Sequence, residues 1–520
     1  MVEGMYSSVR SGTVCGVEGF EIGVEVDVSN GLPMFSMVGY LGSEVKEAQE
    51  RVRTALKNSG FMLPAKRITV NLSPANLHKE GSAFDLAIAV AILIAIGCIS
   101  QDSITEYIVL GELGLNGDVR SVNGVLPMLS YAQKMGVKKA IVPKANAAEG
   151  AVLSDMQVFG VTTLKETADY FMGLERGEEL LLPASGEKKD HAGSDYPHDL
   201  SEVAGQHFVK RAMEIAAAGF HNLLLIGPPG TGKSMLAQCI PSIMPSLSRK
   251  ESIEITKIYS VKGLLQEGQS LIRERPFRAP HHTLSAAALT GGGRIPLPGE
   301  MSLAHNGVLF LDELPEFSKE AIEVMRQPLE DKKLTIARVM ASYTFPADFM
   351  LVAAMNPCPC GYFPDRSRCH CTSSMIRRYL GRISQPMLDR IDLCVEVAAV
   401  PFAKLKQTEK EEPSKAVRKR VEQARLRQKE RYNADGISFN SQLRAGKIQS
   451  VCNMSREAEK FFQQQMKEQE LSARSYHRIL RVAKTVADLE GQEEIQLPHL
   501  YEAIVYHNGS VKYWQADQEV

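Results

Sequence analysis

Eight consecutive residues of this chain have the types and spacing of a phosphate-binding loop. A lysine in this pattern reaches the β- and γ-phosphates of a nucleotide, and the hydroxyl after it can bind Mg²⁺. The glycines let successive backbone N–H groups point inward at the phosphates. The pattern predicts ATP and Mg²⁺ as ligands, and the alternative is a glycine-rich turn without a ligand. The loop consists of Gly227, Pro228, Pro229, Gly230, Thr231, Gly232, Lys233 and Ser234.

The segments around this loop are those that a phosphate site needs. The apolar run Leu223–Ile226 before it predicts a buried strand, and a helix is expected from about Ser234 to Ile240. The N-terminal end of such a helix carries partial positive charge and attracts an anion. Strand, loop and helix therefore follow one another in the order that makes a chance glycine-rich turn a poor explanation.

Acidic and amide side chains follow two further apolar runs. Asp312 and Glu313 come directly after the predicted strand 308–311, and Asn356 ends the predicted strand 349–355. A phosphate loop needs a carboxylate for Mg²⁺ and a base for the attacking water, which we assign to Asp312 and Glu313. An amide at the position of Asn356 can orient that water or sense the γ-phosphate.

Four of the nine cysteines lie within one short segment, as Cys358, Cys360, Cys369 and Cys371. Thiolates at tetrahedral spacing bind structural zinc, which can hold together a loop that has no core of its own. The C-x-C spacing is tighter than the usual C-x₂-C, so a disulfide or redox role and unligated thiols remain as alternatives. His370 is a further candidate ligand.

The composition predicts a large cytoplasmic protein of about three domains. The chain has 520 residues, 44% of them apolar, and a net charge of −1 that favours no class of partner. No secretory signal begins it, its cysteines are mostly scattered, and its longest apolar run, Leu86–Ile99, predicts a buried helix too short to cross a membrane. We divide the chain into 1–174, a polar linker 175–198, the nucleotide-binding segment 199–400 and a helix-rich segment 401–520.

The first segment alternates between helix-like and strand-like patterns. We expect helices at 44–59 and 130–135 and strands at 67–72 and 140–142. In the last segment, the run Ser414–Tyr432 is strongly basic. The favoured interpretation of that run is the solvated face of a helix.

This order of motifs resembles the AAA+ ATPases, and within them the magnesium-chelatase-like proteins of the YifB/ComM family. The resemblance covers essentially the whole chain. It implies an α/β fold, with an N-terminal Lon-protease-like α+β domain, a P-loop domain with a parallel sheet, and a C-terminal helical lid.

The resemblance also assigns roles to residues outside the phosphate loop. Val203, Gly205 and Gln206 would frame the adenine, and Asn356 would be the first sensor. Arg390 would be an arginine finger that reaches a neighbouring subunit's nucleotide, and Arg474 would be the second sensor. A finger that acts between subunits implies a homo-oligomeric ring, because each site is completed by the next chain, and the resemblance implies a hexamer.

Two basic segments are candidates for contact with DNA. In relatives of the chelatase and MCM type, hairpins at 275–283 and 332–338 project toward the pore of the ring. Lys332, Lys333 and Arg338 could meet phosphates there, giving binding that is salt-sensitive and tolerant of sequence. The alternative is an exposed charged hairpin without a ligand.

The N-terminal segment resembles the proteolytic domain of Lon but departs from it at the catalytic positions. Ala83 stands where the serine nucleophile is expected, with Ser82 one residue early, and Leu126 stands at the place of the lysine base. A serine nucleophile is inert without an adjacent base. We therefore expect a domain that supports the ring or guides DNA, and no peptidase.

Three classes of function remain at this point. The leading hypothesis is a ring-forming ATPase that moves DNA, most of all by branch migration during recombination in natural transformation. The second is the motor subunit of a magnesium chelatase, which remodels a protein partner. The third, a non-enzymatic scaffold, is disfavoured by the complete set of Lys233, Asp312 and Glu313.

Overall fold

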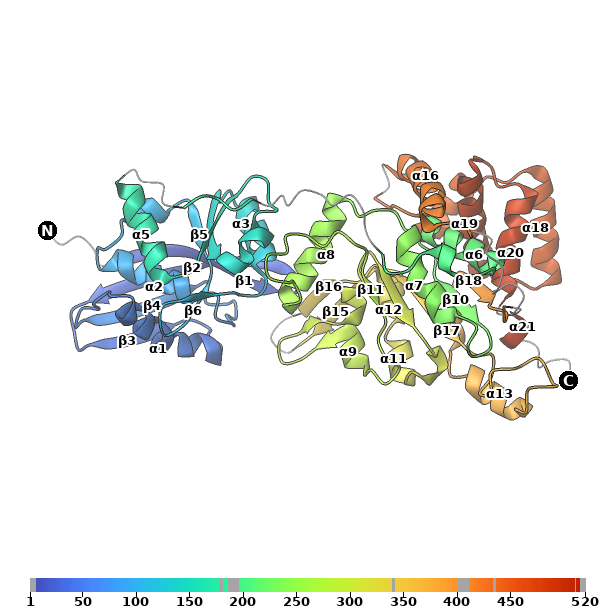
Figure 1. Cartoon of the computed structure of the whole chain (residues 1–520), viewed down its shortest axis with the longest axis horizontal. Coiled ribbons are helices and arrows are strands. Elements are labelled where there is room, and N and C mark those ends of the chain that lie inside the picture. The colour runs from blue at the N-terminus through green and yellow to red at the C-terminus, as the bar shows by residue number, and fades with distance from the viewer. Residues whose placement is uncertain are drawn as a thin grey trace.

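The computed structural model describes residues 6–176, 181–185, 196–338, 342–400, 411–433, 436–509 and 511–514. An N-terminal domain lies at one end, a domain with a parallel sheet in the middle and a set of helices at the other end (Figure 1). Residues 187–195, predicted to belong to a linker, lie outside the described residues. Among those described, no helix is long and apolar enough to cross a membrane.

The N-terminal domain is built on a seven-stranded sheet that is antiparallel in one part and mostly parallel in the rest. Its order is β3-β4-β2-β1-β5-β8-β9, in which β2 pairs antiparallel with both β1 and β4, whereas β5, β8 and β9 are parallel. The strands are β1 (Tyr6–Cys15), β2 (Glu18–Ser29), β3 (Met34–Val38), β4 (Arg67–Ser73), β5 (Tyr107–Val109), β8 (Lys139–Pro143) and β9 (Gln157–Val161).

Helix α2 (Asp85–Ala95) is buried along its whole length in this domain, which confirms the predicted buried helix. It ends before Gly97, whose φ of 81° is left-handed, instead of continuing to Ile99. Helix α3 begins earlier than predicted, directly after the left-handed Gly124. The other elements are α1 (Ser43–Asn58), α3 (Val125–Lys134), α4 (Ala147–Gly150), α5 (Leu164–Glu175), and the short pair β6 (Glu112–Leu113) and β7 (Val119–Arg120).

The middle domain contains a five-stranded sheet, in the order β11-β14-β17-β10-β18, whose paired strands are all parallel. Side chains alternate between two apolar cores along each strand: Leu223 and Leu225 face one, and Leu224 and Ile226 the other. Burial on both faces explains why these strands are continuous apolar runs. The strands are β10 (Leu223–Ile226), β11 (Phe277–Arg278), β14 (Val308–Leu311), β17 (Met350–Met355) and β18 (Leu393–Glu396).

Helices and two small hairpins complete this domain. The hairpins are β12 (Gly291–Gly292) with β13 (Leu297–Pro298), and β15 (Lys333–Ala337) with β16 (Ser342–Pro346). The helices are α6 (His207–Gly219), α7 (Lys233–Ile243), α8 (Arg249–Lys262), α9 (Ala286–Thr290), α10 (Glu300–Leu303), α11 (Lys319–Glu323), α12 (Arg326–Asp331), α13 (Ser373–Leu380) and α14 (Gln385–Leu388).

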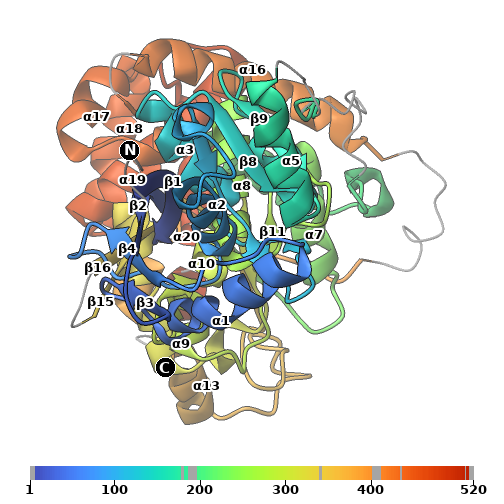
Figure 2. The same cartoon turned by 90° about the vertical axis from the view of Figure 1, so that its left-hand side faces the viewer.

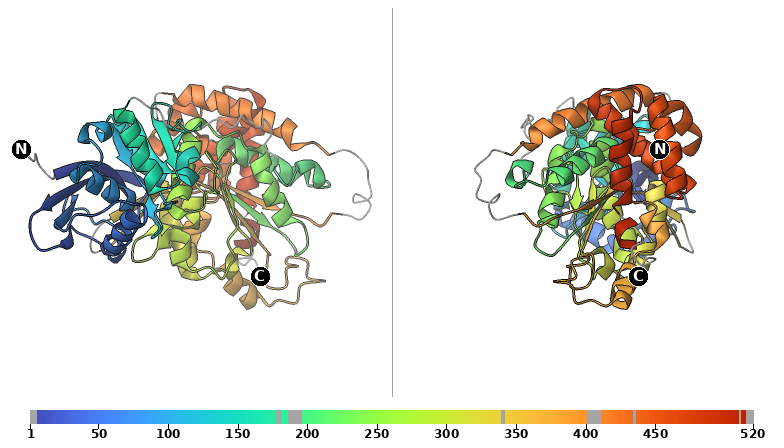
Figure 3. Two further views of the ribbon diagram at one scale, coloured as in Figure 1. Left: turned by 60° about the vertical axis from the view of Figure 1, so that its left-hand side comes forward. Right: turned by 90° about the vertical axis from the view of Figure 1, so that its right-hand side faces the viewer.

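The C-terminal helices pack on one side of the middle domain, where α16 contacts α6, α7 and α19 (Figure 3). Their buried side chains share one core with the sheet and with α6. The helices are α16 (Ser414–Tyr432), α17 (Ala445–Val451), α18 (Arg456–Glu468), α19 (Ala473–Glu490), α20 (Leu497–Asn508) and α21 (Val511–Trp514).

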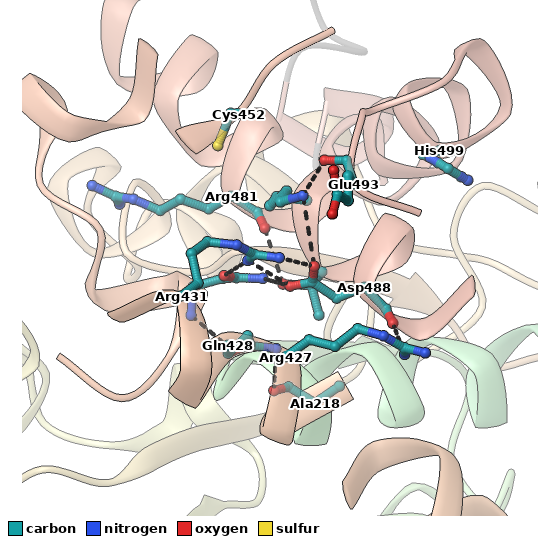
Figure 4. A network of polar contacts seen from close by, with 12 residues as sticks. Ala218, Arg427, Gln428, Arg431, Cys452, Arg481, Asp488, Glu493 and His499 are labelled. Carbon is teal, nitrogen blue, oxygen red and sulfur yellow. Dashed lines mark hydrogen bonds and ion pairs between the residues drawn. The ribbon is translucent and has the colours of Figure 1, made fainter. Parts of the chain in front are cut away.

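The basic helix α16 is only in part the solvated face that its sequence suggests, because Lys419 and Lys429 are exposed whereas several of its arginines have partners inside the fold. Arg425 is buried and lies 3.7 Å from the centre of the Phe439 ring. Arg431 forms an ion pair with the fully buried Asp488, and Arg427 donates to the Asp488 carbonyl (2.7 Å; Figure 4). These charges attach α16 to α19, so a run of basic residues here stabilises the fold.

The N-terminal and middle domains meet through α8. Lys257 on α8 donates to the Ser130 hydroxyl (2.7 Å), Arg249 donates to the Val152 carbonyl (2.8 Å), and the Ser260 hydroxyl is hydrogen-bonded to Glu149. Seen along the long axis, the N-terminal domain lies in front of the middle domain (Figure 2). The contact combines these hydrogen bonds with apolar packing, since Ile253 of α8 lies against the core around α3.

Candidate nucleotide-binding site and cysteine cluster

The predicted phosphate loop connects β10 to α7 and has an open inner side. Gly230 and Gly232 have left-handed φ values of 75° and 84°, and a Cβ atom added to either would meet nothing within 4 Å. The Lys233 ammonium lies at the base of the loop, where it donates to the carbonyls of Gly227 and Pro228 (2.8 Å each). This open cradle with a lysine at its base fits a polyphosphate.

Lys233 also links the loop to the end of β17. Its ammonium donates to Oδ1 of Asn356 at 3.0 Å, so the lysine and the predicted first sensor are in direct contact. Burial lowers the pKa of Lys233, while Asp312 and Glu313 act in the opposite sense. A partly desolvated cation beside two carboxylates is well placed to interact strongly with phosphate oxygens.

The two predicted magnesium ligands are also in contact. Oγ of Ser234 donates to Oδ2 of Asp312 at 2.6 Å, and the other oxygen of Asp312 accepts from the Glu313 backbone N–H at 2.9 Å. A hydroxyl and a carboxylate that converge beside a phosphate loop are the oxygen ligands that Mg²⁺ takes in such ATPases. Ser234 and Asp312 therefore fit the predicted ion.

Glu313 lies directly after β14 with an unusual backbone conformation. Its φ of 53° is left-handed, which is uncommon for a residue with a side chain. Its carboxylate lies 3.1 Å from Nδ1 of His282, and slightly more than half of the side chain is exposed. Strain of this kind is often found at functional sites, because the surrounding structure must hold it in place.

The residues predicted to frame the adenine lie before α6. The Gly205 N–H donates to Glu411 (2.6 Å) and Gln206 donates to the Ala398 carbonyl (2.6 Å), while Val203 is nearly buried. Lys210 donates to both Glu411 (2.8 Å) and the Val203 carbonyl (2.6 Å). These contacts fix the segment against the residues that follow β18 and those that precede α16.

The two predicted arginines are engaged within the chain. Arg390 forms an ion pair with Glu330 and donates to the Arg326 carbonyl (3.2 Å), leaving 13% of its side chain exposed. Its acidic partner is thus on α12, and not the adjacent Asp389. Arg474 is 73% exposed at the start of α19, where it pairs with Asp389 at 3.3 Å. Both arginines are therefore held by acidic residues in the isolated chain.

The four clustered cysteines converge on one point. All their sulfur atoms lie within 4.8 Å of one another, and three of the pairs are separated by 3.4, 3.6 and 3.7 Å. Zinc–sulfur bonds of about 2.3 Å in a tetrahedron place the sulfurs about 3.8 Å apart, so the arrangement fits a Cys₄ metal site. All nine cysteines are free, and His370 is exposed outside the cluster. The cluster is Cys358, Cys360, Cys369 and Cys371.

The prediction of a basic hairpin at 275–283 is wrong. Its residues Phe277–Arg278 form the edge strand β11, which pairs with β14. Arg275 is buried and bonded to the Pro245 and Asn306 carbonyls (2.6 Å each), and Arg278 pairs with Glu300 at 2.7 Å. The arginines stabilise the sheet edge, because a strand of only two residues needs such contacts to stay in place.

The second basic segment does form a hairpin, β15–β16, with residues 339–341 outside the described part. Lys333, Thr335 and Ala337 are exposed on one face, whereas Leu334 between them is buried, as the alternation of a strand requires. Arg338 is exposed and donates to the Gly293 carbonyl of the neighbouring hairpin (3.4 Å). Lys332 instead pairs with Asp348 at 3.2 Å and takes no part in the exposed face.

The Lon-like positions in the N-terminal domain are closed off by local contacts. Leu126 is fully buried in α3, and its N–H donates to Glu149 (2.8 Å). The Ser82 hydroxyl is hydrogen-bonded to Glu112. The ammonium of the fully buried Lys79 donates to the Pro74 carbonyl.

Several residues at the site were missed by the sequence analysis. His282 was assigned to a DNA-binding segment, although it pairs with Glu313. Lys210 and Glu411 meet across 201 residues of sequence, and no local pattern links them. Gly361 lies inside the cysteine segment and contacts the phosphate loop. For Gly361, the only signal in the sequence is a glycine directly after Cys360 of the cysteine motif.

Comparison with known proteins covers nearly the whole chain. Residues 199–405, 24–146 and 411–507 match the families described as magnesium chelatase, subunit ChlI; subunit ChlI of Mg-chelatase; and magnesium chelatase, subunit ChlI C-terminal. The chain is 43% identical over 505 residues to the competence protein ComM of Haemophilus influenzae, covering 96% of each protein. It is 42% identical over 504 residues to YifB of Escherichia coli, again covering 96% of each.

A shorter match supports the Lon-like fold. It is to Lon protease 2 of Bacillus subtilis, with 30% identity over 152 residues, 29% of this chain and 25% of that protein. The parallel sheet with its phosphate loop and the helical C-terminal segment complete the predicted fold class. The chain belongs to the ComM and YifB family of magnesium-chelatase-like AAA+ ATPases.

Proposed function

We propose that this ATPase forms a ring of identical subunits, most simply a hexamer, and moves DNA through it, acting in branch migration during recombination of incoming DNA. The observation that carries the proposal is the exposed hairpin β15–β16, which carries Lys333 and Arg338 and belongs to the same domain as the phosphate loop. Lys333 and Arg338 on this hairpin suit the phosphates of DNA, which bind cations without regard to sequence. The name of the H. influenzae relative, a competence protein, agrees with a role in DNA uptake.

The chemistry that such a motor needs can be assigned to this chain's residues. Lys233 binds the β- and γ-phosphates, and Ser234 and Asp312 would hold Mg²⁺, which supplies charge neutralisation at the phosphates. Glu313 accepts the proton of the attacking water, and Asn356 orients that water. The left-handed backbone of Glu313 and its contact with His282 fix the carboxylate in place.

A ring is proposed because one chain does not present Arg390 to its own phosphate loop. The partners of Arg390 are Glu330 and the Arg326 and Pro386 carbonyls. A neighbouring subunit would take the arginine from these contacts, and an arginine supplied between subunits accelerates phosphoryl transfer on the order of 10³-fold or more. Head-to-tail contacts of this kind close into rings.

We infer that the N-terminal domain is a support and not a peptidase. Leu126 occupies the place of the Lon lysine, and the hydroxyl of Ser82 is hydrogen-bonded to the Glu112 carboxylate and not to a lysine. The domain contacts α8, and its turn at Gly16 lies against Thr344 of the hairpin β15–β16. It is therefore placed to position the hairpin.

We further propose that the cysteine cluster holds one zinc ion per chain. Sulfur separations close to those of a ZnS₄ tetrahedron support zinc over a disulfide, because every cysteine is free and no two sulfurs are at bonding distance. Metal analysis of protein purified without chelator tests this: about one zinc per chain is expected, and none in reduced protein would reject it.

The experiment that tests DNA movement is an ATPase assay with single-stranded, duplex and four-way junction DNA. Hydrolysis should rise with DNA, most of all with the branched substrate, and the stimulation should fall as salt increases. A purified, active ATPase that is indifferent to all three substrates would reject the proposal.

Substitutions in the hairpin β15–β16 test whether it is the site of contact with DNA. Replacing both Lys333 and Arg338 with alanine should weaken DNA binding and lower the slope of its salt dependence by about one unit per lost phosphate contact. The matched control replaces the exposed Lys460 and Lys467 of α18, which should leave DNA binding unchanged. Equal effects of the two double variants would show that only net charge matters.

A second function keeps support from the family descriptions, which name a magnesium chelatase subunit. In that function the ring would remodel a protein partner. Stimulation of ATP hydrolysis by a co-purifying large protein, without any response to DNA, would favour it.

A further inference from the structure

The cysteine cluster is attached to the ATPase site by the chain itself. Cys358 follows Asn356 by two residues at the end of β17, so the first sensor and the first sulfur share one short segment. The last cysteine, Cys371, is followed directly by Thr372, whose hydroxyl caps α13. The loop from Cys358 to Cys371 and α13 lie at the end of the molecule away from the N-terminal domain (Figure 1).

The loop from Cys358 to Cys371 is also in contact with the phosphate loop. Gly361 has a φ of 88°, and a Cβ atom added to it would lie 2.5 Å from Cδ of Pro229. Real Cβ atoms do not approach that closely, so the backbone of the cysteine loop is in contact with the proline ring. Pro229 lies within the phosphate loop, and its position affects how the backbone N–H groups around it face the phosphates.

A third contact fixes the sensor from the other side. Tyr379 of α13 is nearly buried, and its hydroxyl lies at the backbone of Asn356. Asn356 is in turn bonded to Lys233 at 3.0 Å. The cysteine loop and α13 therefore touch two parts of the ATPase site, Pro229 and Asn356.

An ion bound between the four sulfurs would hold them at these separations. Thiolates at these separations repel one another, and the repulsion is removed when they share a divalent cation. The loop's backbone hydrogen bonds are local, such as Gly361 N–H to the Cys358 carbonyl (2.9 Å), and Cys358, Cys369 and Cys371 also lie in an apolar core. Folding of a loop of this type is coupled to metal binding.

We propose that metal binding at the four cysteines fixes Pro229 and Asn356 in their active positions, so that occupancy of the cluster controls ATP binding and hydrolysis. Because coupling between two binding sites is reciprocal, ATP must tighten metal binding by the same factor. The proposal rests on ATP hydrolysis at the phosphate loop, and is independent of DNA movement.

The first test uses cobalt, whose tetrahedral thiolate complexes absorb visible light, in place of zinc in the full-length chain. A non-hydrolysable ATP analogue should change this spectrum and raise the affinity for cobalt at least about fivefold, the lower end of the usual range of coupling between sites. The analogue should bind the metal-free protein more weakly by the same factor. An unchanged spectrum together with unchanged affinities would overturn the proposal.

The second test separates metal binding from the contact with the phosphate loop. Gly361→Ala keeps all four cysteines but places a methyl group against Pro229, so it should bind one metal ion and lose about 10- to 100-fold in ATP hydrolysis without DNA, as expected for a small misplacement of catalytic groups. The matched control is Gly268→Ala, because Gly268 has a similar φ of 75° with nothing within 4 Å. It should leave hydrolysis unchanged.

If Gly361→Ala also loses its metal, the cysteine variants decide. Cys360→Ser should lower metal content and hydrolysis together, whereas Cys98→Ser, an exposed cysteine of the N-terminal domain, should lower neither. Folded, metal-free Cys360→Ser protein with wild-type hydrolysis would overturn the proposal. These assays contain no DNA, so the two proposals can fail separately: loss of DNA stimulation with intact coupling rejects only the DNA motor.

Discussion

The ammonium of Lys233 lies 3.0 Å from Oδ1 of Asn356, which joins the phosphate loop to the end of the neighbouring strand β17. The two residues are 123 positions apart in sequence, and the parallel pairing of β10 with β17 brings them together. The same lysine is bonded to two carbonyls of its own loop. The side chain is thus held in place at the site of the phosphates before any nucleotide is bound, which lowers the entropic cost of binding.

The first prediction follows from this contact. Lys233→Ala should weaken ATP binding by at least about 30-fold, because a hydrogen bond to a charged group contributes about 2 kcal/mol or more. Asn356→Ala should instead keep most of the affinity and lower hydrolysis by about 100-fold, as loss of a group that positions the reacting water does. Titration with a fluorescent ATP analogue measures binding, and phosphate release measures hydrolysis. If both variants lose only binding, Asn356 is not a sensor.

The second prediction concerns Glu313. Glu313→Gln should bind ATP with nearly wild-type affinity and hydrolyse it about 10²- to 10⁴-fold more slowly, because the amide cannot accept the proton of the attacking water. Rapid-quench measurement of a single turnover checks this directly. His282→Asn is the companion variant, and it should have a smaller effect since it only orients the carboxylate. Near-wild-type turnover by Glu313→Gln would place the base elsewhere.

The features that the sequence predicted correctly are those encoded by neighbouring residues. One example is the unbroken order of the strand 223–226, the phosphate loop and the start of α7. Another is β14, which is followed directly by Asp312. The four cysteines that lie close together in sequence also converge in space. The strands of the parallel sheet are also predictable from neighbouring residues, because both of their faces are buried and each strand is therefore a continuous apolar run.

The wrong predictions concern side chains whose partners are distant in sequence. Arg275 and Arg278 look like a basic surface segment, but Glu251 and Glu300 neutralise them across the fold. The sequence does not show the partners of the arginines of helix α16 for the same reason, since Asp488 is 57 residues away from Arg431. The number of basic residues in one segment does not show where in the fold their acidic partners lie.

The third prediction is a pH dependence of stability that arises from His507. Burial, and then the adjacent Arg478, lower the pKa of His507 to about 3 in the folded chain, although Asp389 and Asp392 act in the opposite sense. Arg478 Nη2 lies 2.6 Å from Nδ1 of His507, which suits a neutral ring as acceptor. Between pH 6.5 and about 3 the unfolded chain binds a proton that the folded chain does not, so stability must fall as pH decreases.

The size of the effect can be stated for one pH. At pH 5 the unfolded state gains about 2 kcal/mol from protonation of an ordinary histidine, and His507→Asn removes this contribution. Denaturant unfolding at pH 7.5 and pH 5 should therefore show a smaller loss for His507→Asn than for the wild type, by about that amount. Equal losses would mean that His507 is protonated in the folded chain.

The fourth prediction tests whether Arg390 acts between subunits. Arg390→Ala should leave ATP affinity nearly unchanged and lower hydrolysis by about 10³-fold, as loss of an arginine finger does. Mixing it with Lys233→Ala protein should restore part of the activity, because some interfaces then pair an intact phosphate loop with an intact arginine. The structural alternative is the ion pair with Glu330, which holds the arginine in the isolated chain. Glu330→Gln separates the two: a finger freed from this pair keeps or gains activity, whereas a structural pair would lose stability in both variants. Folded, ring-forming mixtures without rescue would reject catalysis between subunits.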